Sequence, residues 1–138
     1  MLAIKREQRE VLGEPAFVDR LIAYLRRAHL EWVYALSDDE LRMRVVHGLA
    51  KGRGYGLTWE FSLTVFVSHM LTIGPEFDKE PAIQRVLRDE SIAPDSRMEA
   101  LLGRAVSEDD WYDAVAMCDR DEYWAEVRKR VETSREGD

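Results

Sequence analysis

The amino-acid sequence predicts an all-α fold, a compact single-domain bundle of about six to eight short helices. Apolar residues recur every third or fourth position along most of the chain, and glycine, proline and serine punctuate these stretches. No two segments show the alternation expected of paired strands. The length of 138 residues suits one domain, so we expect a single helical domain over residues 1–138, with residues 133–138 frayed.

The first half of the chain contains three clear helix patterns. They cover residues 5–12, residues 15–30, and a stretch that follows the capping box of residues 37–40 and ends in the glycine-rich residues 51–56. Pro15 suits a first helical turn, because the N–H group that proline lacks has no partner there.

Residues 59–73 are ambiguous between strand and helix. Trp59, Phe61 and Leu63 begin an alternation typical of a strand. Polar residues at 60, 64, 68 and 72 and apolar residues at 59, 63, 66, 67 and 70 instead follow helical spacing. A lone strand would leave its backbone groups unpaired, so we predict a buried helix that ends at Gly74-Pro75.

The second half predicts four more helices. They span residues 81–88, residues 94–106, residues 108–118 after a Ser107 cap, and residues 121–132.

Composition excludes two classes of protein. With 46% hydrophobic residues the chain is too apolar for simple disorder, and its longest apolar-rich stretch, residues 61–73, is too polar and too short to span a bilayer. The charged N-terminal sequence has no signal-peptide pattern, and Cys118 has no second cysteine to pair with. We therefore expect a cytoplasmic protein that does not enter a membrane.

Charge is distributed unevenly. Residues 1–69 contain ten basic and nine acidic residues, a net of +1, whereas residues 70–138 contain ten basic and eighteen acidic residues, a net of −8. Nucleic-acid binding normally needs a basic surface, so we expect no nucleic-acid partner. An acidic half either keeps the protein soluble or faces a basic protein partner.

No motif in the sequence predicts a cofactor, a metal site or a catalytic residue. His29, His47 and His69 lie on separate predicted helices, and none has a second ligand at helical spacing. Cys118 is followed by acidic residues near a helix end, where a reactive thiolate is disfavoured. The three glycines of residues 52–56 match no phosphate-binding spacing, although the helix that follows Thr58 could hold an anion at its start.

Aromatic residues are more numerous than a small helical core needs, with four Trp and five Tyr. Trp and Tyr are favoured anchors of protein interfaces, and several lie among carboxylates near the C-terminus. We predict a partner-binding face of Trp111, Tyr112, Asp109, Asp110, Asp113, Tyr123 and Trp124. Further loop candidates are Tyr55, Glu60, Phe77 and Asp78.

Two groups of residues resemble a known pattern. They are Tyr55-Gly56-Leu57-Thr58-x-Glu60 with Met70, and Gly74-Pro75-Glu76-Phe77-Asp78-x-x-Pro81 with Leu87 and Arg97-Met98. This pattern is similar to that of uncharacterised small helical bacterial proteins encoded near type VI secretion or contractile-injection genes. The similarity covers residues 55–100, with a weaker match around Glu7-Gln8. It implies a bacterial accessory protein and transfers no active site.

The leading hypothesis is a non-catalytic protein-binding accessory, adaptor or immunity protein of a bacterial secretion or effector system, with a basic effector as partner. The oligomeric state is left open. One alternative is a small enzyme or effector whose site combines Glu60, Asp78 and His69. Another is an acidic protein that mimics DNA.

Overall fold

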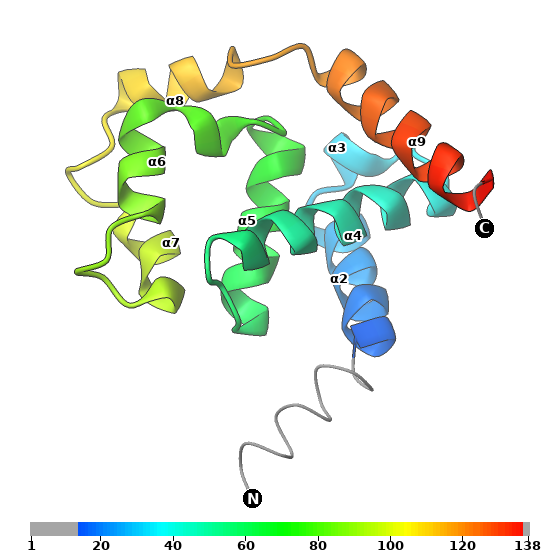
Figure 1. Cartoon of the computed structure of the whole chain (residues 1–138), viewed down its shortest axis with the longest axis horizontal. Coiled ribbons are helices and arrows are strands. Elements are labelled where there is room, and N and C mark those ends of the chain that lie inside the picture. The colour runs from blue at the N-terminus through cyan, green and yellow to red at the C-terminus, as the bar shows by residue number, and fades with distance from the viewer. Residues whose placement is uncertain (1–13, 137–138) are drawn as a thin grey trace, which may run out of the picture. The chain divides into compact units, whose positions relative to one another are not determined.

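Every regular element in residues 14–136, which the computed structural model describes, is helical (Figure 1). These residues form eight α-helices and two short 3-10 helices: α2 (Glu14–Ala28), α3 (Leu30–Val33), α4 (Asp38–Gly54), α5 (Glu60–Thr72), η1 (Phe77–Lys79), α6 (Pro81–Leu87), η2 (Pro94–Ser96), α7 (Arg97–Ala100), α8 (Glu108–Val115) and α9 (Arg120–Glu136). The predicted all-α class is confirmed. The helix expected over residues 5–12 lies outside the described residues.

The chain divides into two compact units, residues 1–46 and 47–138, and the boundary lies inside α4. The expectation of a single domain therefore stays a prediction. In the first unit the predicted apolar stripe of α2 is buried at Phe17, Val18, Leu21 and Leu25.

The short helix α3 was not expected from the sequence. Arg26 holds the chain around it, because its guanidinium donates to the carbonyl oxygens of Val33 at 2.8 Å and Leu36 at 2.9 Å. The same guanidinium forms a 2.9 Å ion pair with Asp38 in the first turn of α4. The turn between α2 and α4 thus depends on the side chain of Arg26 from the preceding helix rather than on a local sequence pattern.

In the second unit, α4 packs closely on α5 through two glycines one turn apart. A Cβ atom at Gly48 would lie 3.0 Å from Val67, and one at Gly52 would lie 3.1 Å from Leu63. These glycines let α5 approach, and the helix ends at Gly54, within the predicted glycine-rich stretch. The left-handed turn that ends this segment uses Gly56, whose φ is +90°.

The ambiguous segment is helical, and most of α5 is buried, as predicted. Its polar stripe survives burial because the hydroxyls bond within the helix. Thr64 donates to the Glu60 carbonyl at 2.7 Å, Ser68 to the Thr64 carbonyl at 2.8 Å, and Thr72 to the Ser68 carbonyl at 2.8 Å. Each hydroxyl is satisfied by the carbonyl oxygen one turn earlier, so these polar side chains need no partner outside the helix.

The start of α5 differs from the prediction in two ways. Trp59, expected in the buried stripe, is 58% exposed. The N–H groups of Thr58 and Trp59 both donate to the Asp95 carboxylate at 2.9 Å, and the Thr58 hydroxyl donates to the same group at 2.8 Å. A carboxylate of the chain itself therefore occupies the place where the sequence suggested an external anion.

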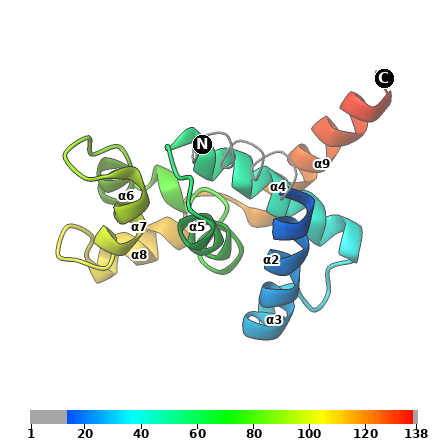
Figure 2. The ribbon, with the colours of Figure 1, turned by 90° about the horizontal axis from the view of Figure 1, so that it is seen from below.

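Figures 1 and 2 show α6 and α7 side by side in the second unit, and both α6 and α8 contact η1. The helix expected over residues 94–106 ends at Ala100. Beyond this end Leu101 and Val106 are still buried, but Leu102 is 78% exposed, and Gly103 raises the cost of continuing the helix. The next helix, α8, starts at the predicted Ser107 cap, which forms a complete capping box with Asp110.

The last helix, α9, continues to Glu136, beyond the fraying expected from residue 133. Trp124 and Val127 are buried on it. Arg120 at its start donates to the Thr72 carbonyl at 3.1 Å and also to the carbonyls of Leu71 and Ile73. This side chain therefore fills the role of a cap at the C-terminal end of α5.

Candidate functional site

An ion pair with a buried carboxylate joins α4 to η1 in the second unit. The Nζ of Lys51, on α4, is 2.8 Å from Oδ1 of Asp78 on η1, whose side chain is 1% exposed. Lys51 also donates to the Pro75 carbonyl at 2.8 Å and lies over the ring of Tyr123, 5.4 Å from its centroid. Removing one partner of such a pair leaves a buried charge, which typically costs about 3–5 kcal/mol.

Tyr55 completes the surroundings of Asp78. Its hydroxyl donates to Oδ2 of Asp78 at 2.6 Å, and it also hydrogen-bonds Gln84 on α6. Burial, together with the hydrogen bond to Asp78, raises the pKa of Tyr55 to about 12. Tyr55 thus keeps its proton at neutral pH and acts as a hydrogen-bond donor.

A second polar pair joins α4 to α9. Nε2 of His47 lies 2.7 Å from the hydroxyl of Tyr123, and its ring stacks edge-on against Trp124. Burial lowers the pKa of His47, and the positive charges of Lys51 and Arg130 lower it further. Burial raises the pKa of Tyr123 to about 12. The Tyr123 hydroxyl therefore keeps its proton and can donate a hydrogen bond to the neutral imidazole of His47.

These contacts form a polar cluster that joins α4, η1 and α9: His47, Lys51, Tyr55, Asp78 and Tyr123. The cluster does not assemble the Glu60, Asp78 and His69 site of the enzyme alternative. Glu60 and His69 are nine residues apart on α5, which separates them by about 13 Å along the helix axis. The His69 ring instead packs edge-on against Phe77 and Trp111. Of the three residues, Asp78 alone belongs to the cluster, and its oxygens face Lys51 and Tyr55.

The remaining candidates for chemistry lie apart from one another. Within residues 14–136, no group of three or more His, Cys, Asp or Glu side chains could hold a metal ion. Burial raises the pKa of Cys118, and the negative charge of Glu76 raises it further. The sequence predicted a disfavoured thiolate here, but from the acidic residues that follow Cys118 rather than from Glu76. No helix in the same part of the chain is long and apolar enough to cross a bilayer.

The predicted partner-binding residues divide between core and surface. Trp124 is 2% exposed, so its place is in the core and not on a binding face. Tyr123 and Trp111 are half-buried against the histidine rings, and Asp110 closes the capping box of α8. The loop candidates divide similarly. Phe77 and Asp78 are buried, Tyr55 is half-buried, and Glu60 is exposed.

What remains of the predicted face is the outward side of α8. Tyr112 is 67% exposed and Val115 is 47% exposed, with exposed carboxylates beside them on the same side of the helix. We call this surface the α8 acidic face: Glu108, Asp109, Tyr112, Asp113 and Val115. Ala114 is the one buried residue of α8, so the helix contributes most of its surface to solvent.

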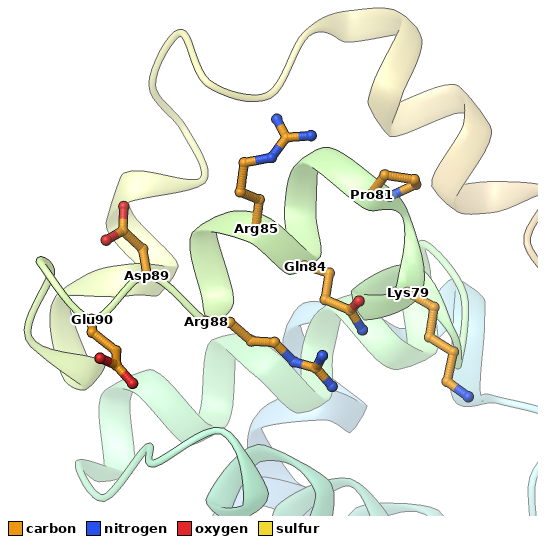
Figure 3. Close-up of a pocket in the computed structure, with 7 residues that line it drawn as sticks. All are labelled: Lys79, Pro81, Gln84, Arg85, Arg88, Asp89 and Glu90. Atoms are coloured by element: carbon orange, nitrogen blue, oxygen red, sulfur yellow. The ribbon is translucent and has the colours of Figure 1, made fainter.

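Sequence reasoning missed two features of the second unit. Lys51, which neutralises Asp78, gave no signal, because its partner is 27 residues away and in no local pattern with it. A hollow along α6 was also missed. It has a volume of about 680 Å³ and is lined by Lys79, Pro81, Gln84, Arg85, Arg88, Asp89 and Glu90 (Figure 3). Its basic residues were masked by the acidic composition of residues 70–138.

The chain shows no significant match to any protein-family model, curated protein or solved structure.

Proposed function

We propose that this protein is a non-catalytic binding module, an adaptor or immunity protein that engages a basic protein partner through the α8 acidic face. The resemblance of residues 55–100 to proteins encoded near secretion and contractile-injection genes suggests where to seek that partner, among effectors encoded nearby. The observation that carries the proposal is the exposure of Tyr112 and Val115 among three carboxylates on one helix.

The α8 acidic face has the composition of an interface. An exposed Tyr supplies a large rigid contact that can also hydrogen-bond, and such residues recur as anchors of protein interfaces. Glu108, Asp109 and Asp113 surround Tyr112 as a polar rim. Their common sign favours a basic partner, because complementary charge speeds encounter and rejects acidic competitors.

The buried cluster supports binding over catalysis as the role of this unit. Its ionisable groups already satisfy one another: Lys51 faces Asp78 and a carbonyl, and Tyr55 donates to Asp78. The pKa values of Tyr55 and Tyr123, both raised to about 12, are far from the range useful for proton transfer at neutral pH. The cluster holds α4, η1 and α9 together.

The experiment combines crosslinking with measured affinity. A photo-crosslinking amino acid at position 112 in the native host should capture one basic protein, and the same group at Tyr34, also exposed, should not. With that protein purified, Tyr112→Ala should cost about 2 kcal/mol of binding free energy. The pair Asp109→Lys and Asp113→Lys should weaken binding further, and added salt should weaken the wild-type complex.

Matched controls separate this face from general charge. Tyr34→Ala and the pair Glu99→Lys and Glu126→Lys remove an equally exposed tyrosine and the same number of exposed carboxylates elsewhere. They should leave affinity within about twofold, as distant surface changes do. Equal losses in control and test variants, or an acidic captured partner, would refute the proposed role of α8.

A further inference from the structure

Helix α6 is only seven residues long, yet buried charged side chains fix both its ends. Glu80, 2% exposed, accepts hydrogen bonds from the N–H groups of Ala82 and Ile83 at the first turn. Arg97, 8% exposed, donates to the Leu87 carbonyl at 3.0 Å at the last turn. The same guanidinium reaches the Tyr55 carbonyl at 3.1 Å. A helix clamped in this way presents its outer face with little freedom to move.

The outer face of α6 is basic. Gln84, Arg85 and Arg88 follow Pro81 at i+3, i+4 and i+7, so the four residues share one side of the helix. This side lines the hollow of about 680 Å³, with Lys79 at one end and Glu90 at the other. We call this surface the α6 groove: Lys79, Pro81, Gln84, Arg85, Arg88, Asp89 and Glu90.

The two arginines of the α6 groove are available to a ligand. Within residues 14–136 neither Arg85 nor Arg88 forms a salt bridge, although the second unit is rich in carboxylates. Lys79 has only a long contact, 3.7 Å, with Glu76. Gln84, on the same side of α6, hydrogen-bonds Tyr55, and the Tyr55 hydroxyl donates to the buried Asp78. Gln84 therefore has a hydrogen-bond partner before any ligand arrives.

The spacing of the cations selects the kind of anion. Figure 3 shows the side chains of Arg85 and Arg88 leaving this side of α6 in different directions, with Lys79 separate from both. This divergence suits a chain with several carboxylates better than one small anion. A nucleic acid would bring a continuous phosphate backbone past Asp89 and Glu90, which oppose it, whereas a peptide can place an uncharged or basic residue there.

We propose that the α6 groove binds an acidic peptide segment of a protein partner. Carboxylates of the segment pair with Arg85 and Arg88, and Lys79 adds to the attraction. Glu90 at the far end accepts an amide or a basic side chain of the same segment, which sets its direction. This site is separate from the α8 acidic face and has the opposite charge, so it does not depend on the function proposed for that face.

The test uses the full chain and a fluorescein-labelled hexaglutamate peptide, followed by fluorescence anisotropy at low salt. The wild-type chain should bind it, and hexaglutamine should not bind. The double substitution Arg85→Glu and Arg88→Glu replaces both attractions to the peptide by repulsions, and it should weaken peptide binding about tenfold or more. The milder pair Arg85→Gln and Arg88→Gln should give an intermediate loss, and urea unfolding of each variant confirms that it is folded.

Three results decide against the proposal. One is an equal loss with Arg104→Glu and Lys129→Glu, a control that makes the same charge change at exposed positions outside the groove. Another is displacement of the peptide by inorganic phosphate at the same concentration, which would indicate a small-anion site. The third is tighter binding of a DNA duplex of equal charge. The pair Asp109→Lys and Asp113→Lys in α8 should not weaken peptide binding, which separates this site from the α8 acidic face.

Discussion

Asp78 depends on two partners from other parts of the second unit. Its carboxylate is buried, and Lys51 and Tyr55 from α4 and the turn after it provide the compensating charge and hydrogen bond. Gln84 extends this chain of contacts to α6. A buried carboxylate without these partners would be too costly to keep, so the cluster specifies how η1 and α6 meet the end of α4.

His47 predicts a pH dependence of stability. Its pKa in the folded chain lies below the ordinary value of 6.5, since burial and the charges of Lys51 and Arg130 outweigh the opposing effect of Asp78. Between the two pKa values the unfolded chain binds more protons, so the free energy of unfolding should fall as pH drops below about 6.5. Urea unfolding at pH 7.5 and at pH 5.5 measures the loss. His47→Gln should reduce that loss. A His47→Gln chain with the wild-type pH profile would show that this histidine is not the cause.

At the scale of elements, Asp95 is the residue on which the start of α5 depends. Burial opposes its charged form, but hydrogen bonds from the N–H groups of Trp59 and Thr58 lower the pKa of Asp95 below its usual value. Asp95→Ala should lower the free energy of unfolding by about 1–2 kcal/mol, as loss of a helix cap does. Asp95→Asn keeps an acceptor and should cost less, and Ser96→Ala, at an exposed neighbour, should cost little. Urea midpoints compare the variants, and equal midpoints for Asp95→Ala and wild type would contradict the capping role.

Elements with a repeating local signal were predictable from the sequence. The i, i+4 stripe of α5 and the Ser107 cap of α8 depend on neighbours within one or two turns, and both are confirmed. Other features depend on contacts distant in sequence. The turn at α3 is held by Arg26, and α7 is shorter than its apolar pattern indicated.

The candidate site follows the same rule. Asp78 was named from the sequence, but its partner Lys51 was not, since pairing across 27 residues leaves no periodic trace. The exposed Tyr112 was named together with the buried Trp124, because composition alone does not separate anchors of a surface from rings of a core. The α6 groove could not be found by counting charges, since its cations lie in the acidic half of the chain.

At the scale of the whole molecule, the second unit combines a well-buried element with helices that are mostly surface. Seven residues of α5 are buried, whereas α8 buries Ala114 alone. Local opening costs more where more apolar surface would be exposed, so stability should not be uniform across the unit. The two charged surfaces proposed for binding lie on the lightly buried helix α8 and on the clamped helix α6.

Native-state hydrogen exchange should therefore separate these helices. Amides of α5 should exchange slowest, through near-global unfolding, and amides of α8 should exchange about a hundredfold faster or more, through local opening. Amides of α6 should be slower than those of α8 despite the shorter helix, because Glu80 and Arg97 hold its ends. Exchange measured by mass spectrometry on peptides covering each helix gives the order. If α8 were as protected as α5, it would have to be held by contacts beyond Ala114, and its outward side would not be the free surface on which partner binding is proposed.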